Sequence, residues 1–402
     1  MKKVIILGNS AINNGNRGCV ALSYCAIYLI NSILGKDNYE LYLTESLQKN
    51  GKHSIKIIDD DISYYSISNI YPISFKSFIK MILNIRNTIK SYRIFKTAYC
   101  VLDIGQGDSF ADIYGENRFK WINSIHQVAR FFSKPYILLP QTIGPFQQEK
   151  IKSLANTSIR NATFVMTRDK QSFEYVIQNI PEQKNLSEYI DVAFFLPYTK
   201  KSFANNKVHV GLNISALLWN GGYTRDNQFN LKCDYRKCVR GIIAYFLSLG
   251  NTVIHLIPHV VEQERGVEND YAVSFDLYEE YNNEQLVLAP FFLSPIDAKN
   301  YISALDFFMG ARMHTTIAAF SAEVPVVPMA YSRKFNGLFI DTLDYRYMVD
   351  LKKDSDEDVL NKIRTAFDDR VQIKEIVKLR IDGVVEEKKK QLQQDLTKCL
   401  NL

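Results

Sequence analysis

The chain has 402 residues, of which 47% are apolar and 23% charged, the ordinary proportions of a folded protein. These proportions exclude a disordered chain, a collagen and a small disulfide-stapled domain. The 49 basic and 43 acidic side chains give a net charge of +6, a small excess that permits anionic ligands and argues against a nucleic-acid-binding protein. At about 150 residues per domain, the length predicts two or three domains.

The cysteines and the start of the chain predict a cytoplasmic protein. None of the six cysteines forms a CxxC pair or a Cys/His group with zinc-ligand spacing, so we expect no metal site. The first apolar run, residues 4–7, is too short for a signal peptide. No run of 18 apolar residues predicts a transmembrane helix.

The first half of the chain alternates strand and helix signals. Residues 4–7 predict a buried strand, followed by a loop through residue 18 and a helix that ends near Gly35. Each later strand signal is followed by a loop and a helical pattern, which predicts a parallel sheet with helices on both faces. These later strands are expected at residues 55–58, 99–104, 136–139 and 164–167.

The same rhythm begins again after a polar break at residues 198–207. Strands are expected at residues 208–214, 253–257, 286–288, 307–309 and 324–329, with helices at 235–249 and 295–304 and one long charged helix at 372–400. We therefore predict a first α/β domain over residues 1–200, a second over 207–370 and a C-terminal helix over 371–402. Ligands in such sheets bind beyond the carboxyl ends of the strands.

The loop at residues 9–18 follows the first strand and contains four asparagines, an arginine and two glycines. Asn13, Asn16 and Arg17 are candidates for hydrogen bonding to a polar ligand such as a sugar. The alternative is a turn in which asparagine and glycine adopt left-handed backbone conformations. The loop has neither the GxGxxG pattern nor the GK[ST] of a phosphate-binding loop.

Two further loops follow strands of the first half. In residues 103–110, alternating glycines would leave Gln106 and Asp108 exposed, and Asp108 could orient or deprotonate a hydroxyl group. The alternative is an aspartate that caps the next helix. Gln141 follows the strand at 136–139, where the pattern alone indicates only a loop at a strand end.

The strongest local pattern is GARMHTTIAAF at residues 310–320, between a strand and a helix. Arg312, Met313, His314 and Thr315 place a guanidinium, an imidazole and helix-start N–H groups together. This combination suits an anion that carries both a carboxylate and a phosphate. The alternative is a helix cap and an inter-domain salt bridge.

Three residues outside this stretch are secondary candidates. Tyr331 and Lys334 follow the next strand, although Lys334 could equally be an ordinary surface lysine. His259 lies at the end of another strand, and Pro258 between it and His255 argues against a shared metal site.

The segment 75–96 is both basic and apolar. Its basic residues are Lys76, Lys80, Arg86, Lys90, Arg93 and Lys96. An ordinary surface helix and a peripheral contact with an anionic membrane are both open interpretations.

Taken in order, these motifs resemble the polysaccharide pyruvyl transferase family over residues 1–345. The resemblance rests on NNGNRG (13–18), GQGD (105–108), QTIGPF (141–146), RDKQS (168–172), DVAF (191–194), GARMH (310–314), VPVVP (324–328), Tyr331 and Lys334. It implies a GT-B-like architecture of two Rossmann-like domains whose parallel sheets face a central cleft, with a C-terminal helix. It also implies transfer of the enolpyruvyl group of phosphoenolpyruvate to a sugar of a cell-surface glycan, exopolysaccharide or precursor, forming a pyruvate ketal and releasing phosphate.

The resemblance also implies site roles. Arg312 and His314 would bind phosphoenolpyruvate, with His314 as the proton donor and no metal or organic cofactor. The expected phosphoenolpyruvate site, on the second domain, comprises Arg312, Met313, His314, Thr315, Lys334 and His259. The expected acceptor site, on the first domain, comprises Asn13, Asn16, Arg17, Gln106, Asp108 and Gln141, with Asp108 also as catalytic base. The acceptor would be a glycan or lipid-linked saccharide, and the location the cytoplasm or the inner face of the membrane.

The chain departs from the family at one position. Many relatives carry an arginine just after the first strand of the second domain, where this chain has Asn213-Ile214-Ser215. Arg168, Arg240, His259 or Lys334 could supply the missing charge. Two alternative functions remain open: a GT-B glycosyltransferase that uses a nucleotide sugar, and a catalytically silent glycan-binding subunit.

Overall fold

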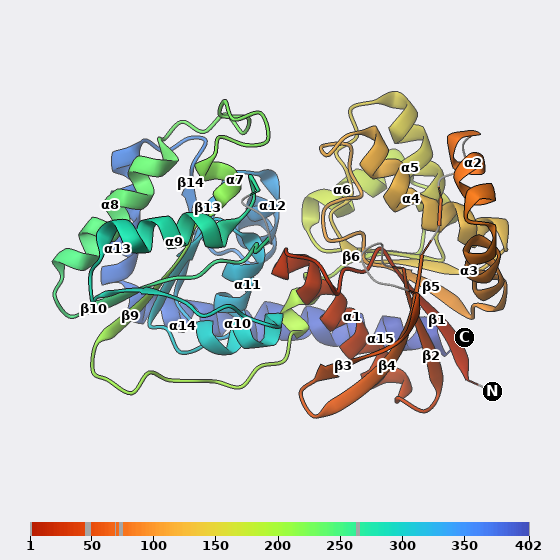
Figure 1. Ribbon diagram of the computed structural model, residues 1–402, viewed down its shortest axis with the longest axis horizontal. Coiled ribbons are helices and arrows are strands. Elements are labelled where there is room, and N and C mark those ends of the chain that lie inside the picture. The colour runs from red at the N-terminus through yellow and green to blue at the C-terminus, as the bar shows by residue number, and fades with distance from the viewer. Residues whose placement is uncertain (1, 45–49, 69, 72–74, 263–265, 402) are drawn as a thin grey trace. The chain divides into compact units, whose positions relative to one another are not determined.

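The computed structural model describes residues 2–44, 50–68, 70–71, 75–262 and 266–401, which form two compact units (Figure 1). The first unit comprises Met1–Asn14, Leu22–Phe195 and Lys388–Leu402. The second comprises Gly15–Ala21 and Leu196–Glu387. Two short segments therefore differ from the predicted domain boundaries: the start of the first helix belongs to the second unit, and the end of the chain returns to the first.

The first unit is built on an eight-stranded sheet in the order β3-β4-β2-β1-β5-β6-β7-β8. All neighbouring strands are parallel except β3 and β4. The strands are β1 (Lys3–Gly8), β2 (Tyr39–Thr44), β3 (Gly51–Ile57), β4 (Asp60–Ile67), β5 (Cys100–Asp103), β6 (Tyr136–Gln141), β7 (Phe164–Thr167) and β8 (Leu186–Glu188). The helices are α1 (Arg17–Leu34), α2 (Phe75–Leu83), α3 (Ile85–Thr97), α4 (Glu116–Phe131), α5 (Glu149–Asn161), α6 (Lys170–Asn179) and the short 3₁₀ turn Val192–Phe195.

Burial explains why the central strands form. Every residue of β5 and β6 is buried, as expected for parallel strands covered on both faces. Residues of α3, α4, α5 and α6 pack with these strands in one apolar cluster that includes Phe95, Phe119 and Ile125. Helix α1 is long and apolar enough to cross a membrane by length and composition, but 61% of that window is buried inside the fold. Gly35 ends it with a positive φ of 73°, as predicted.

One edge of this sheet was predicted wrongly. Residues 55–58 were expected to lead into a helix, but β3 pairs with the antiparallel strand β4 in a hairpin. The turn uses Ile58 in a left-handed conformation (φ 56°), which is uncommon for a β-branched residue and gives no turn signal in the sequence. Strands β2, β4 and β8 were not predicted.

The second unit is built on a six-stranded parallel sheet in the order β11-β10-β9-β12-β13-β14. Numbered from its own first strand, this order is 3-2-1-4-5-6, the Rossmann order, which reverses direction between β9 and β12. The strands are β9 (Val208–Asn213), β10 (Thr252–Leu256), β11 (Leu286–Leu288), β12 (Phe307–Gly310), β13 (Val326–Ala330) and β14 (Val349–Asp350). The helices are α7 (Ala216–Trp219), α8 (Tyr235–Ser248), α9 (Asp270–Tyr281), α10 (Pro295–Ile302), α11 (Met313–Ser321), α12 (Arg333–Phe335) and α13 (Asp356–Asp368).

The five strands predicted for this half match β9 to β13, and the helices predicted at 235–249 and 295–304 match α8 and α10. The single helix predicted at the end is instead α14 (Arg370–Arg380) and α15 (Glu386–Leu400), joined by the π-helical turn Ile381–Val385; a second π-helical turn, Asn336–Thr342, follows α12. Leu379, an apolar residue of α14, is 70% exposed.

Candidate functional site

The candidate site of the second unit lies where the strand order reverses, the usual ligand position in such a sheet. Asn213 ends β9, and its side chain hydrogen-bonds to the backbone just after β10 and β12. Its Oδ1 accepts the backbone N–H of Arg312 at 2.9 Å, and its Nδ2 donates to the carbonyl of Ile257 at 2.8 Å. Asn213 is fully buried. Asn213 therefore positions the backbone at the start of α11.

The guanidinium of Arg312 is held by two acidic residues. Its Nη2 and Nε donate to the Asp270 carboxylate at 2.8 and 3.1 Å, and its Nη1 donates to Glu268 Oε2 at 3.1 Å. Asp270, at the start of α9, is fully buried and also accepts the backbone N–H groups of Ala216 and Val260. Burial lowers the pKa of Arg312, but the charge and hydrogen bonds of Asp270, together with Tyr331 and Glu268, raise the pKa above its ordinary value.

This geometry bears on the expected role of Arg312. The two edges on which a guanidinium binds planar oxyanions face Asp270 and Glu268, so Arg312 is already paired and is only 8% exposed. Through these pairs Arg312 connects the start of α11 with the acidic residues at the start of α9.

His259 is a buried imidazole next to this trio. It is 4% exposed, and neither ring nitrogen has a hydrogen-bond partner among the residues that the structure describes. Burial lowers the pKa of His259 well below its ordinary value, and the charges of His314, Arg312 and Arg17 lower it further. The ring is therefore neutral, with one N–H donor and one acceptor.

His314 lies where two helices begin. It is the second residue of α11, it is partly buried, and its imidazole adjoins Gly18, the second residue of α1. A Cβ added to Gly18 would lie 2.3 Å from His314 Nδ1, so only glycine leaves room for this ring. The positive ends of both helix dipoles thus meet at the histidines, which favours a bound anion.

Asn16 and Arg17 were predicted on the acceptor side, in the first domain; the structure places them in the second unit. Asn16 bridges to Val260, and the backbone N–H of Arg17 donates to the His259 carbonyl at 3.0 Å. Gly15 makes the approach possible, since a Cβ there would lie 2.4 Å from the Val261 carbonyl oxygen. Close packing, rather than left-handed turn geometry, is the reason for the glycines of this loop.

Two further residues of the expected phosphoenolpyruvate site are buried. Met313 is 4% exposed, and the fully buried Thr315 donates its hydroxyl and its N–H to the Arg312 carbonyl, at 2.6 and 3.1 Å. Lys334 is in α12, with its Nζ 5.7 Å from the ring centre of Tyr331. Tyr331 in turn raises the pKa of Arg312 electrostatically.

In the first unit, the strand order reverses between β1 and β5. A buried hydrogen-bond network around Asp103 links the ends of these two strands. Asp103 ends β5 and accepts hydrogen bonds from Asn9 Nδ2 at 2.6 Å and Gly105 N at 3.0 Å; its other oxygen lies 2.8 Å from His126 Nε2. All of these side chains are buried. The network holds the two strand ends and presents the loop that follows β5.

Of the acceptor residues predicted in the first unit, Asn13 and Asp108 are accessible. Asn13 is exposed, and Asp108 is partly exposed and accepts a hydrogen bond from the Tyr114 hydroxyl at 3.0 Å. Gln106 was expected to be exposed but is 9% exposed and bonded to Arg118. Gln141 is fully buried and donates to the Asp103 carbonyl at 3.0 Å, so it supports the loop and is not available to an acceptor.

Neither arginine suggested as a substitute for the missing charge lies at the second unit's site. Arg168 belongs to the first unit, is 2% exposed and pairs with Asp191 at 2.7 Å. Arg240 forms a surface pair with Glu280. Arg17 is close to His259 and lowers the pKa of His259 through its charge.

Comparison with known proteins decides the family. The sequence model described as polysaccharide pyruvyl transferase matches residues 16–333, well over half of the chain. The chain belongs to the polysaccharide pyruvyl transferase family. The match covers the start of α1, the β5 loop and the junction from β12 to α12, which are the segments that build both sites.

Solved structures show the fold of this polysaccharide pyruvyl transferase. Anabaena HepE in complex with UDP and glucose has a TM-score of 0.60 at 12% identity, over 99% of this chain and 100% of that one. Sucrose-phosphate synthase from Thermosynechococcus elongatus has a TM-score of 0.58 at 11% identity, over the full length of both chains. UDP-GlcNAc 2-epimerase from Neisseria meningitidis has a TM-score of 0.57 at 8% identity, over 98% and 100%. The fold is GT-B-like, as predicted.

The transferase also contains a group of side chains with metal-ligand chemistry that the sequence analysis did not anticipate. Cys233, Cys238 and Asp356 place their ligand atoms within 4.8 Å of one another. Structural zinc sites use four protein ligands, and the described residues supply three here. We therefore assign no metal to this group.

The sequence analysis missed the acidic partners of the site. Glu268 and Asp270 lie more than forty positions before Arg312, and nothing in their local pattern marks them. The one available signal was position: they occupy the connection from β10 to the next helix, beyond a strand end beside β9.

Proposed function

We propose that the chain transfers the enolpyruvyl group of phosphoenolpyruvate to two hydroxyl groups of a sugar, forming a pyruvate ketal and releasing phosphate. Family membership supports a transferase of polysaccharide biosynthesis. The chemistry of the second unit's site supports a donor that carries a phosphate.

The observation that carries this proposal is the pair of histidines where α1 and α11 begin. His259 keeps two unpartnered ring nitrogens in a buried position, which costs about 1–3 kcal/mol for each unsatisfied group. A phosphate oxygen that accepts the His259 N–H would remove part of this cost. The two helix starts add favourable interaction with the same negative charge.

Arg17 is the cation that we assign to the donor in place of the arginine that many relatives carry just after the first strand of the second domain. Its backbone binds His259, its charge acts on His259, and its guanidinium lies 5.4 Å from the ring centre of the half-exposed Phe291. Arg312 has a different role: its pairing with Asp270 and Glu268 holds the start of α11 in place and so positions His314.

In the proposed reaction, His314 donates a proton to the methylene carbon of phosphoenolpyruvate. The adjacent carbon becomes electron-poor and is attacked by one sugar hydroxyl. The carbon–oxygen bond to phosphate then breaks, and a second hydroxyl attacks to close the ketal. Of the two hydroxyl protons, one replaces the proton that His314 donated and the other leaves with phosphate. General acid catalysis of this kind contributes about 10²–10⁴-fold.

Asp108 is the residue of the first unit that we propose for the acceptor. It is the accessible carboxylate of the loop after β5, and Tyr114 and Arg118 lie around that loop. The proposal assigns no step to a metal or organic cofactor.

Thermal unfolding with added ligands tests the donor. We expect phosphoenolpyruvate to raise the melting temperature, since a ligand at 100 times its Kd stabilises the native state by about 2.7 kcal/mol. Arg17→Ala and His259→Gln should reduce this shift, whereas Arg240→Ala, the control, should keep it. Stabilisation by UDP but not by phosphoenolpyruvate would instead identify a nucleotide-sugar glycosyltransferase. Stabilisation by saccharides alone would identify a glycan-binding subunit.

A further inference from the structure

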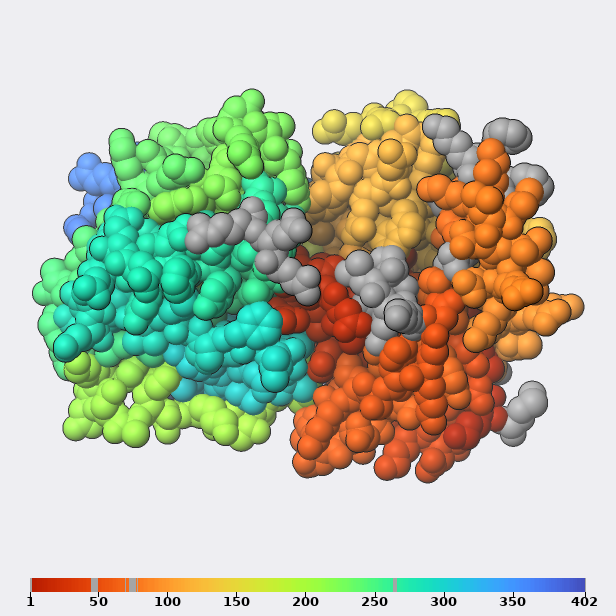
Figure 2. All heavy atoms as spheres, in the orientation of Figure 1, coloured from red at the N-terminus to blue at the C-terminus, as the bar shows by residue number. Residues whose placement is uncertain are grey.

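The helices α2 and α3 of the first unit expose apolar side chains together with basic ones. The apolar residues are Ile79, Ile82, Leu83, Ile85 and Ile89, and the basic residues are Lys80, Arg86, Lys90, Arg93 and Lys96. We call these ten residues the α2–α3 surface; they lie among the orange atoms of Figure 2.

Helix α3 exposes two isoleucines although it buries two polar side chains. Its buried residues are Thr88, Ser91 and Phe95, and Ser91 donates its hydroxyl to the Ser68 carbonyl. Ile85 and Ile89, one turn apart, are 53% and 45% exposed, whereas Phe95 packs in the apolar core. Core packing therefore does not explain why isoleucine occupies these two positions.

The exposed residues of α2 continue this apolar area. Ile82 is 53% and Leu83 77% exposed, at the end of α2 and directly before the turn into α3. Contiguous exposed apolar area of this kind marks a contact with a protein or a membrane.

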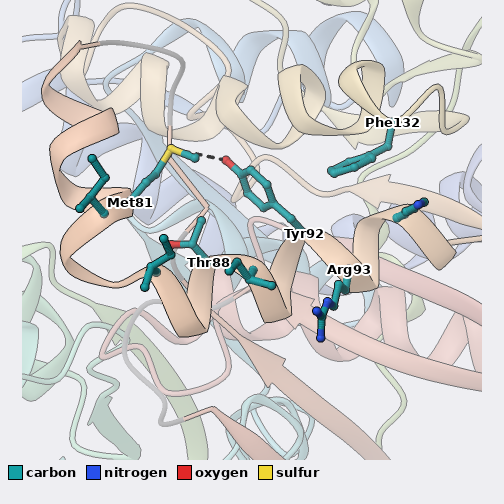
Figure 3. A pocket seen from close by; sticks show the side chains of 9 residues that line it. Met81, Thr88, Tyr92, Arg93 and Phe132 are labelled. Atoms are coloured by element: carbon teal, nitrogen blue, oxygen red, sulfur yellow. Dashed lines mark hydrogen bonds between the residues drawn. The ribbon is translucent and has the colours of Figure 1, made fainter.

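A groove runs between the two helices (Figure 3). It has a volume of about 340 Å³ and is lined by Met81, Ile82, Ile85, Thr88, Ile89, Tyr92, Arg93, Lys96 and Phe132. Tyr92 and Phe132 close one side edge to face, with ring centres 5.9 Å apart. Arg93 and Lys96 stand at its border, so the groove is apolar within and positively charged at one end.

The charge of the segment identifies the partner. Residues 75–97 contain six Lys and Arg side chains and no Asp or Glu. Because the whole chain has 49 basic and 43 acidic residues, the remainder is balanced, with 43 of each. The net charge of the protein therefore resides in this one segment. A protein partner would need a large acidic face, whereas an anionic bilayer supplies both negative headgroups and an apolar layer beneath them.

We propose that the α2–α3 surface docks the protein on an anionic lipid bilayer. The isoleucines and Leu83 enter the boundary between headgroups and acyl chains, and the lysines and arginines around them bind the headgroups. This inference goes beyond the proposed function and does not depend on it, because the surface belongs to the first unit and no step of the transfer uses it.

Vesicle flotation with the full chain tests the proposal. We expect binding to vesicles of phosphatidylcholine mixed equally with phosphatidylglycerol, no binding to phosphatidylcholine alone, and release by high salt. Arg86→Gln combined with Lys90→Gln should weaken binding about 25-fold, since each basic residue near such a surface contributes roughly fivefold. Ile82→Ser combined with Leu83→Ser should weaken it at least about tenfold through lost apolar burial.

The control is Lys352→Gln combined with Lys374→Gln, which removes the same charge from exposed positions of the second unit and should leave vesicle binding unchanged. All variants should keep the wild-type melting temperature, because the altered side chains are exposed. The proposal is overturned if the wild type does not bind anionic vesicles, or if the control variant weakens binding as much as the Arg86→Gln, Lys90→Gln variant does. It is also overturned if the wild type is a dimer that does not bind vesicles and if Ile82→Ser combined with Leu83→Ser converts that dimer to a monomer. The last result would show that a second copy covers the surface.

Discussion

At the scale of single residues, the candidate site is defined by how its charges are compensated. Arg312 looks like an anion clamp in the sequence, yet its guanidinium is neutralised by Asp270 and Glu268. His259 differs from Arg312, because neither of its ring nitrogens has a hydrogen-bond partner among the described residues. The starts of α1 and α11 contribute positive potential near this ring.

Removing the Arg312 side chain should destabilise the protein. Arg312→Ala leaves Asp270 buried without its counter-charge, which typically costs about 3–5 kcal/mol. Urea unfolding should show this loss, while Arg240→Ala, which breaks a surface pair, should cost less than about 1 kcal/mol. Unchanged stability of Arg312→Ala together with a raised KM for the donor would show that Arg312 is a clamp after all.

Gly18→Ala tests the position of His314. The added methyl group would lie 2.3 Å from His314 Nδ1, so the imidazole must move. A displacement of about 1 Å can cost about 100-fold in rate, and we expect kcat to fall at least about tenfold with the melting temperature little changed. Gly383→Ala is the matched control, because nothing lies within 4 Å of a Cβ there. Equal kcat values for Gly18→Ala and Gly383→Ala would show that Gly18 does not determine the position of the reacting groups.

At the scale of elements, the strongest predictions came from strands buried on both faces. The five strands β9 to β13 were predicted correctly because a short, continuous apolar run is typical of a strand that is buried on both faces. The β3–β4 hairpin was missed because its turn has no glycine and its register depends on pairing. The location of Asn16 and Arg17 in the second unit, and the Arg312 trio, depend on contacts between distant segments. No local pattern in a single sequence contains that information.

The adjacent strands β9 and β10 carry a pair of histidines that should make stability depend on pH. His255 Nε2 lies 2.8 Å from His209 Nδ1, and its Nδ1 lies 2.6 Å from the Tyr301 hydroxyl. Burial, followed by His209, lowers the pKa of His255 to about 3. The unfolded chain binds a proton at the ordinary pKa of about 6.5. The folded protein binds that proton only near pH 3, so its stability should fall as the pH drops below about 6.5.

Urea unfolding at about pH 7.5 and about pH 5.5 measures this dependence. The wild type should lose unfolding free energy between about pH 7.5 and about pH 5.5. In His255→Gln this loss should be smaller by about 1.4 kcal/mol, since the variant lacks the histidine whose pKa is lowered. Tyr301→Phe removes the hydrogen bond but keeps the imidazole, and it should retain most of the wild-type difference. A His255→Gln variant with the full wild-type difference would assign the pH dependence to other groups.

At the scale of the whole molecule, the chain crosses between the two units at both of its ends. Gly15–Ala21 belongs to the second unit, and Lys388–Leu402 returns to the first. The returning segment is held by buried Leu392, Leu396 and Leu400 and by a hydrogen bond of 2.9 Å from the Tyr189 hydroxyl to Asp395. Each unit is therefore completed by a segment that is distant in the sequence, which explains why domain limits drawn along the chain were displaced.

The central claim for the molecule is that His314 protonates phosphoenolpyruvate during transfer to a sugar. The most direct measurement is phosphate release from phosphoenolpyruvate in the presence of a sugar acceptor, with the ketal detected by mass spectrometry. We predict turnover by the wild type and a loss of at least about 100-fold in His314→Ala at an unchanged melting temperature. Wild-type turnover that persists undiminished in His314→Ala would contradict the account.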